Sequence, residues 1–158
     1  MSTVVVRRGE LRDADVLADF NCRMAMETEG KTLDRATVHR GVSFLLDPTH
    51  EAYGRYLVAE DDAGAVVGCL LLTAEYSDWN ATQYLWIQSV FVREDCRRRG
   101  VFTRLFDAAK EVCRSENAAA LRLYVEHDNA RARATYEKLG MRASHYAMYE
   151  AGPSLWTP

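Results

Sequence analysis

A single stretch, residues 84–105, limits the folds open to this chain, because it predicts a buried strand, a turn and a helix start in direct succession. Its first half, residues 85–92, is rich in β-branched and aromatic residues, which is typical of a largely buried strand. Beyond a polar turn, apolar residues recur at helical spacing through residues 101–113. Gly100 therefore lies at a helix entrance, where unpaired backbone N–H groups and the helix dipole can hold an anion.

Three consecutive arginines, Arg97, Arg98 and Arg99, precede this glycine. A short arginine–glycine motif is more often an ordinary solvated turn than a ligand site. Its place between a buried strand and an amphipathic helix favours a site for a small polyanion instead. The formal net charge of the chain is -3. This acidic balance argues against a dedicated nucleic-acid binder, because such proteins derive much of their affinity from a positive surface.

Length and composition indicate one domain, residues 1–158, since 158 residues with 48% hydrophobic content can bury a substantial core. We expect a cytoplasmic protein with no membrane partner. No apolar run approaches the roughly 20 residues that span a bilayer, and the polar N-terminal residues lack the apolar core of a signal peptide. The four cysteines are widely separated, with no C-x-x-C pair and no histidine at ligand spacing, so we expect neither a metal site nor a disulfide.

The remaining pattern predicts an α/β fold of the mixed α+β kind, with a central mixed, mostly antiparallel sheet. The expected strands are residues 3–8, 53–60, 65–76, 85–92, 121–125 and 143–150, and the expected helices begin at Asp13 as N-cap, at 34, at 101 and at 130. Strand 121–125 should lie parallel to strand 85–92 through a right-handed crossover. The tail from residue 151 is expected to be irregular, with Trp156 covering an apolar patch.

A second motif, N-x-x-A-x-x-x-Y-x-x-x-G-F/M, occurs at Asn129, Ala132, Tyr136, Gly140 and Met141. A capped amphipathic helix would explain each of these residues separately, but not their combination.

The loop before the third helix carries a related signature, because the pattern Q/R-x-x-G-x-G/A falls on Arg97, Gly100 and Phe102. With both motifs in this order of elements, the whole chain resembles the GNAT family of N-acetyltransferases. Phe102 departs from the pattern, since the family usually has a small residue there. We expect its side chain to point into the core or away from the phosphates.

The resemblance implies transfer of an acetyl group from acetyl-CoA to a primary amine by direct attack, with no metal and no covalent enzyme intermediate. Backbone amides of residues 98–103 would bind the pyrophosphate, and the edge groups of Val90 and Val92 would pair with pantetheine like an added strand. The residues expected to bind acetyl-CoA are Val90, Phe91, Val92, Arg97, Arg98, Arg99, Gly100, Val101, Phe102, Thr103, Asn129, Ala132 and Tyr136.

Tyr136 is the expected general acid for the leaving thiolate. A tyrosine hydroxyl, with a reference pKa of about 10 against about 8.5 for a thiol, can donate its proton without being ionised at neutral pH. The alternative is a core tyrosine with a packing role only.

A base or a proton-conducting water chain is also needed, because an alkylammonium with a pKa of about 10.4 is mostly protonated near neutral pH. Several GNAT branches have a carboxylate on the strand that pairs with pantetheine, but this chain has Gln88 there, and an amide cannot accept the proton. Glu75, at the polar end of the preceding strand, is therefore the first candidate, followed by Asp78, Glu27 and Glu29. These carboxylates and Gln88 could instead bind a cationic substrate, and Glu27 and Glu29 could simply face solvent.

Two further functions stay open beside the enzyme. One is a non-catalytic acyl-CoA sensor or interaction module with the same fold, which Phe102 and Gln88 make conceivable. The other, a nucleic-acid-binding domain, is disfavoured by the acidic balance. The acceptor is a small-molecule or peptide amine, with polyamine, antibiotic, amino acid and protein N-terminus all open. A homodimer is among the oligomeric states considered.

Overall fold

The computed structural model describes residues 4–152, so Trp156 and the first residue of the predicted N-terminal strand, Thr3, lie outside the described residues. The chain divides into two compact units, one through Tyr124 and one from Val125. The expectation of a single domain over residues 1–158 stays a prediction. No described helix combines the length and the apolar character that crossing a bilayer requires.

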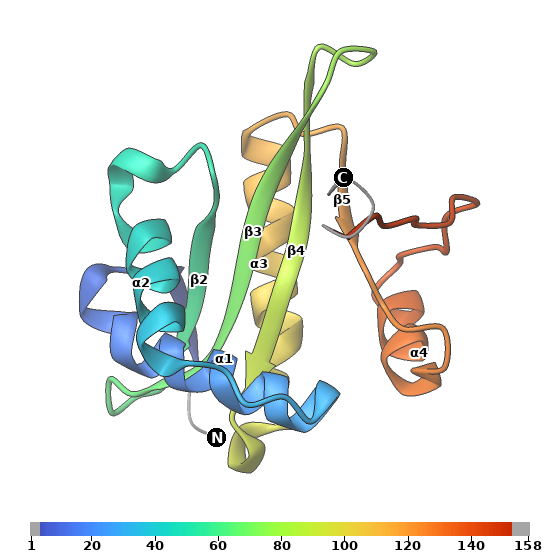
Figure 1. Ribbon diagram of the computed structural model, residues 1–158. Coiled ribbons are helices and arrows are strands. Elements are labelled where there is room, and N and C mark those ends of the chain that lie inside the picture. The colour runs from blue at the N-terminus through green and yellow to red at the C-terminus, as the bar shows by residue number, and fades with distance from the viewer. Residues whose placement is uncertain (1–3, 153–158) are drawn as a thin grey trace. The chain divides into compact units, whose positions relative to one another are not determined.

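The first unit contains a five-stranded sheet in the order β1-β2-β3-β4-β5 (Figure 1). Its strands are β1 (Val5–Arg8), β2 (Arg55–Glu60), β3 (Val66–Ser77), β4 (Thr82–Val92) and β5 (Ala120–Leu123). The first four pair in antiparallel fashion, and β5 joins β4 in parallel. The predicted mixed, mostly antiparallel sheet is thereby confirmed.

Helices cover both faces of this sheet. The first unit has α1 (Ala14–Glu29), α2 (Arg35–Leu46) and α3 (Val101–Ser115), with short 3-10 turns at Leu11–Asp13, Pro48–His50 and Glu94–Cys96. Figure 1 shows α1 and α2 on one face and α3 on the other. The chain passes from β4 through α3 to β5, which is the crossover predicted from the sequence.

Local signals set the ends of α1 and α2. Gly30 ends α1 in the left-handed region at φ 63°, and its N–H donates to the carbonyl of Met26 at 3.1 Å. Asp34 caps α2, because its carboxylate accepts from the N–H of Thr37 at 2.8 Å.

Asp13 occupies the predicted N-cap position of α1, but its side chain does not cap the helix. Instead it accepts two hydrogen bonds from Arg7, at 2.8 and 2.9 Å, and one from the N–H of Glu10 at 2.8 Å. Burial alone would raise the pKa of Asp13, but these hydrogen bonds outweigh burial and hold the pKa below its usual value. Asp13 thus ties the first turn to β1.

The core has a layer on each face of the sheet. On one face, side chains of α1 and α2 pack on β2, β3 and β4, and the rings of Phe20 and Phe91 lie 4.7 Å apart. On the other face, α3 buries Val101, Leu105, Phe106 and Ala109. A Cβ at Gly68 of β3 would lie only 3.2 Å from Val101 and 3.0 Å from the carbonyl oxygen of Phe91. This close approach places the Val101 side chain of α3 against Gly68 of β3, the residue that pairs with Val92 at the end of β4.

The second unit contains α4 (Ala130–Lys138). Asn129 caps it as expected, by accepting from the N–H of Ala132 at 3.0 Å. The strand predicted over residues 143–150 is not formed. Its large side chains at Tyr146, Met148 and Tyr149 are all exposed, so the segment lacks the half-buried face that stabilises a strand.

Candidate active site

Strand β4 changes its pairing at Gln88. Leu71 of β3 pairs with Ser89, whereas the next residue, Leu72, pairs with Ile87, so Gln88 is an extra residue in a β-bulge. Strand β5 pairs with β4 only as far as Ile87. Beyond the bulge, β4 keeps β3 on one side and has no strand partner on the other among the described residues.

The backbone groups on this open edge belong to Val90 and Val92. Arg93 faces β3, because its N–H donates to the carbonyl of Val67 at 2.9 Å. Hydrogen-bonding groups alternate sides along a strand, so those of Val90 and Val92 point away from β3. The Val92 carbonyl accepts from Arg97 Nε at 2.8 Å on that side. The two residues predicted to pair with pantetheine are therefore those that face the open edge.

The loop after β4 leads to an uncapped helix start. Gly100 precedes α3 in the left-handed region at φ 80°, and no side chain caps the helix there. A Cβ built on Gly100 would meet no heavy atom within 4 Å. Arg98 also has a positive φ, 62°, and the side chains of Arg98 and Arg99 are exposed.

This helix start has the features of an anion site, as expected for a pyrophosphate. The first N–H groups of a helix lack partners within the helix, and its N-terminal dipole favours negative charge. The first turn of α3 contains no acidic residue that would repel an anion. Two exposed arginines stand directly before it.

Arg97 turns toward α1. Its Nη2 donates to Glu27 Oε2 at 2.7 Å, and its guanidinium lies 5.6 Å from the centre of the Phe91 ring. The structure thus brings together a residue predicted to bind the cofactor and one predicted to bind the substrate. Beside them lies an open cleft of about 540 Å³, lined by Arg23, Glu27, Phe91, Arg93, Glu94 and Asp95.

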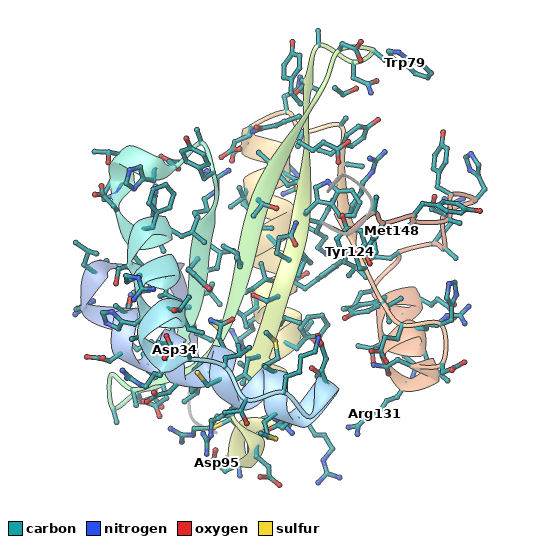
Figure 2. All side chains as sticks on the ribbon, in the orientation of Figure 1. Asp34, Trp79, Asp95, Tyr124, Arg131 and Met148 are labelled. Atoms are coloured by element: carbon teal, nitrogen blue, oxygen red, sulfur yellow. The ribbon has the colours of Figure 1, made fainter. Side chains whose placement is uncertain are left out.

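The other two carboxylates predicted to bind substrate, Glu29 and Asp78, are not among the residues that line this cleft. Glu29 pairs with Lys31 just beyond α1. Asp78 accepts from the N–H of Trp79 at 2.9 Å in the β3–β4 turn, and Trp79 projects from the tip of that hairpin (Figure 2). The strand pairing from Ser77 to Leu72 places this turn about 17 Å or more from the bulge, at about 3.3 Å per residue. Asp78 is therefore too far to touch a group bound at Gln88.

Glu75 belongs to a cluster on β3, β4 and β5. Its Oε2 accepts from Trp86 Nε1 at 2.6 Å, and its Oε1 lies 3.7 Å from Arg122 Nη1. The Arg122 guanidinium lies 3.4 Å from the centre of the Tyr84 ring, and Trp86 stacks on Tyr124 at 4.6 Å. Glu75 pairs across from Tyr84, which places it about 10 Å along the strand from the bulge.

Tyr136 lies in α4, in the second unit, together with Asn129 and Ala132. Partial burial raises the pKa of the Tyr136 hydroxyl above its ordinary value. The hydroxyl therefore keeps its proton at neutral pH. The described residues bring together no group of three or more His, Cys, Asp or Glu that could hold a metal ion.

Comparison with known proteins decides the family. The sequence model of the acetyltransferase (GNAT) family matches residues 20–141. The chain belongs to the GNAT family. A relative from Bacillus subtilis (strain 168), described as the uncharacterized N-acetyltransferase YhfO, is 32% identical over 84 residues. That match spans 53% of this chain and 56% of the relative, about half of each.

Solved structures agree with this assignment. The crystal structure of a possible acetyltransferase from Clostridium difficile 630 is 42% identical, with a TM-score of 0.87 over 94% of this chain and 97% of that one. The aminoglycoside N-acetyltransferase AAC(6')-Iy in complex with CoA is 12% identical, with a TM-score of 0.79 over 97% of each chain. At that identity the second likeness concerns the fold alone.

Phe102 is where this GNAT protein departs from the family's loop pattern. Its half-buried ring lies 6.0 Å from that of Phe106, a buried residue one turn further along α3. The ring therefore packs on an apolar neighbour, as expected for a side chain that points into the core.

Sequence reasoning missed the cluster around Glu75. The cluster lies on the polar face of the strand before α4, opposite the apolar face of Leu121, Leu123 and Val125. The polar face carries Arg122 and Tyr124 at alternating positions, next to the similarly alternating Tyr84 and Trp86. The cluster could have been predicted from this spacing, because an arginine and three aromatic residues alternate along two neighbouring strands.

Proposed function

We propose that this GNAT protein transfers an acetyl group from acetyl-CoA to a primary amine of a small molecule or peptide. One observation carries the proposal: the open edge of β4 beyond Gln88 is followed, after the loop of residues 93–99, by the uncapped start of α3. An extended amide-containing arm can pair with the open strand edge, and a pyrophosphate can bind at the helix start. Pantetheine and pyrophosphate are joined in that order in CoA.

Donor binding would use backbone groups more than side chains. The N–H groups of Val101, Phe102 and Thr103 would bind the pyrophosphate, because they lie in the first turn of α3 and no side chain caps that turn. Open space over Gly100 allows close approach to the backbone. Val90 and Val92 would pair with the pantetheine amides as an added strand would.

In the proposed reaction the amine nitrogen attacks the thioester carbon, the carbon–sulfur bond breaks, and the thiolate leaves. Tyr136 would donate a proton to that thiolate. Its raised pKa keeps the hydroxyl protonated at neutral pH, so a proton is available to hydrogen-bond to the thiolate as charge develops on sulfur.

The amine must also lose a proton, since at about pH 7.4 only about one alkylamine in a thousand is free base. Glu75 lies about 10 Å along the strand from the bulge, so it would accept that proton through water rather than by direct contact. Gln88, exposed in the bulge, could orient such a water. A cytoplasmic location and the oligomeric state stay predictions.

A thiol-release assay tests the proposal, with acetyl-CoA and representatives of four acceptor classes: polyamines, aminoglycosides, amino acids and peptides. We expect CoA release that depends on both substrates for at least one class. Binding of CoA by calorimetry, with no release for any class, would favour the non-catalytic acyl-CoA-binding module.

A further inference from the structure

The last turn of α1 carries an unusual charge for a helix end. It contains Glu27 and Glu29 and no basic residue. The C-terminal end of a helix dipole is negative, so carboxylates there are unfavourable unless a cation neutralises them. Lys31 forms an ion pair with Glu29, and Arg97, 70 residues further along the chain, forms one with Glu27. The Glu27 carboxylate therefore depends on a cation supplied by the loop at the donor site.

Arg97 makes hydrogen bonds to two different elements, α1 and the end of β4. Its Nη2 binds Glu27 at 2.7 Å, while its Nε binds the Val92 carbonyl at 2.8 Å, on the edge that suits pantetheine. The ion pair is partly exposed, with 38% of the Arg97 side chain and 45% of the Glu27 side chain accessible. Such exposed pairs contribute little, whereas a guanidinium binds phosphate strongly through paired hydrogen bonds. A pyrophosphate beside Gly100 would thus compete well for Arg97.

The contacts of Arg97 suggest the chemistry of a group that could replace it at Glu27. The guanidinium contacts both the Glu27 carboxylate and the Phe91 ring, and a carboxylate with an aromatic ring is a combination that also suits an organic cation. The cleft beside Arg97 is lined by Phe91, by Arg23 and Arg93, and by three carboxylates, Glu27, Glu94 and Asp95. A cation bound there would meet a net charge of minus one.

We propose that Arg97 exchanges Glu27 for the CoA pyrophosphate, and that the released Glu27 then binds a cationic group of the acceptor beside Phe91. This inference rests on the proposed function. It makes the acceptor a cationic amine, and it makes donor and acceptor binding mutually favourable. Linkage requires the two effects to be equal, so CoA and the cation each raise the affinity of the other by the same factor.

Phe91 lies three residues beyond Gln88, so a cation beside its ring would sit about 10 Å along the strand from the bulge. An acceptor whose reacting nitrogen lies at the bulge would then place a second positive charge at Glu27. Linear polyamines have this charge spacing, and spermidine is a suitable probe.

The test is calorimetric titration of CoA and spermidine into three proteins: the parent, Glu27→Gln and Asp19→Asn. Asp19 is the matched control, because it is also an α1 carboxylate and pairs with Arg35 at the same 2.7 Å. Glu27→Gln should bind CoA up to about fivefold more tightly, since Arg97 no longer has a competing partner. Asp19→Asn should bind CoA like the parent.

Spermidine should bind the parent more tightly in the presence of CoA, and Glu27→Gln should lose that enhancement. Equal CoA affinities in all three proteins would overturn the exchange while leaving the proposed function standing. Absence of CoA binding to the parent would overturn both. Spermidine binding that is the same with and without CoA, or unaffected by Glu27→Gln, would overturn the assignment of a cationic acceptor to Glu27.

Discussion

Replacing Gly100 by aspartate should weaken CoA binding by about fivefold to about a thousandfold. The site has room for the new side chain, because a Cβ there meets no heavy atom within 4 Å. The left-handed φ of 80° costs a non-glycine residue about 1–2 kcal/mol. The new carboxylate would repel the pyrophosphate, and two like unit charges at about 4 Å repel by about 1 kcal/mol in water and about 4 kcal/mol near a protein surface. Since each 1.4 kcal/mol corresponds to about tenfold in affinity, this repulsion gives the stated range.

Gly64 provides a matched control for this substitution. It lies in the β2–β3 turn, has a φ of 78°, and also has open space at its Cβ position. Both aspartate variants should therefore melt a few degrees lower than the parent, at about 2–4 °C per kcal/mol for a chain of this size. Only Gly100→Asp should lose CoA affinity in calorimetric titration. If Gly100→Asp and Gly64→Asp bind CoA as tightly as the parent, the pyrophosphate does not bind at Gly100.

Tyr136→Phe should lower kcat by about tenfold to about a thousandfold with little change in CoA affinity, because only the proton donor is lost; an unchanged kcat would leave Tyr136 a packing role. Glu75→Gln should lower kcat/KM most near neutral pH and recover partly at alkaline pH, where free amine is abundant; a pH profile that overlays the parent's would eliminate Glu75. The lowered pKa of Asp13 means that its contact with Arg7 stabilises the fold above the unfolded pKa of about 3.9 and is lost as pH falls through the folded pKa. In urea titrations from pH 6 to pH 3 the parent should lose more stability than Asp13→Asn, and equal losses would contradict this.

Much of the fold could be predicted from the sequence, because its signals are local. Gly30 and Asp34 end and begin helices through their own backbone conformation and side-chain geometry. The role of Asp13 could not be predicted in this way. Its carboxylate could accept hydrogen bonds either from the helix N–H groups or from Arg7. It accepts from Arg7 because β1 lies beside the first turn, a tertiary contact that the local sequence does not report.

The site was predicted less completely, because its features depend on register and on distant contacts. Val90 and Val92 are expected to face a ligand because of the family resemblance, since strand alternation alone leaves open which alternating set of residues faces the open edge. The bulge at Gln88 could not be predicted, since it exists only in the pairing of β4 with β3. The pair of Arg97 with Glu27 joins positions 70 residues apart, and no sequence spacing reports it.

The open edge of β4 has a consequence for how the protein behaves in solution. A strand edge with unpaired backbone groups is a template on which a strand of another molecule can add, and such edges seed aggregation. Arg97 blocks one of these groups by binding the Val92 carbonyl, and it places a charged side chain where a second chain would approach. A donor that pairs with Val90 and Val92 would cover the rest of the edge. The same groups that suit an extended ligand therefore make that ligand a solubilising partner of the protein.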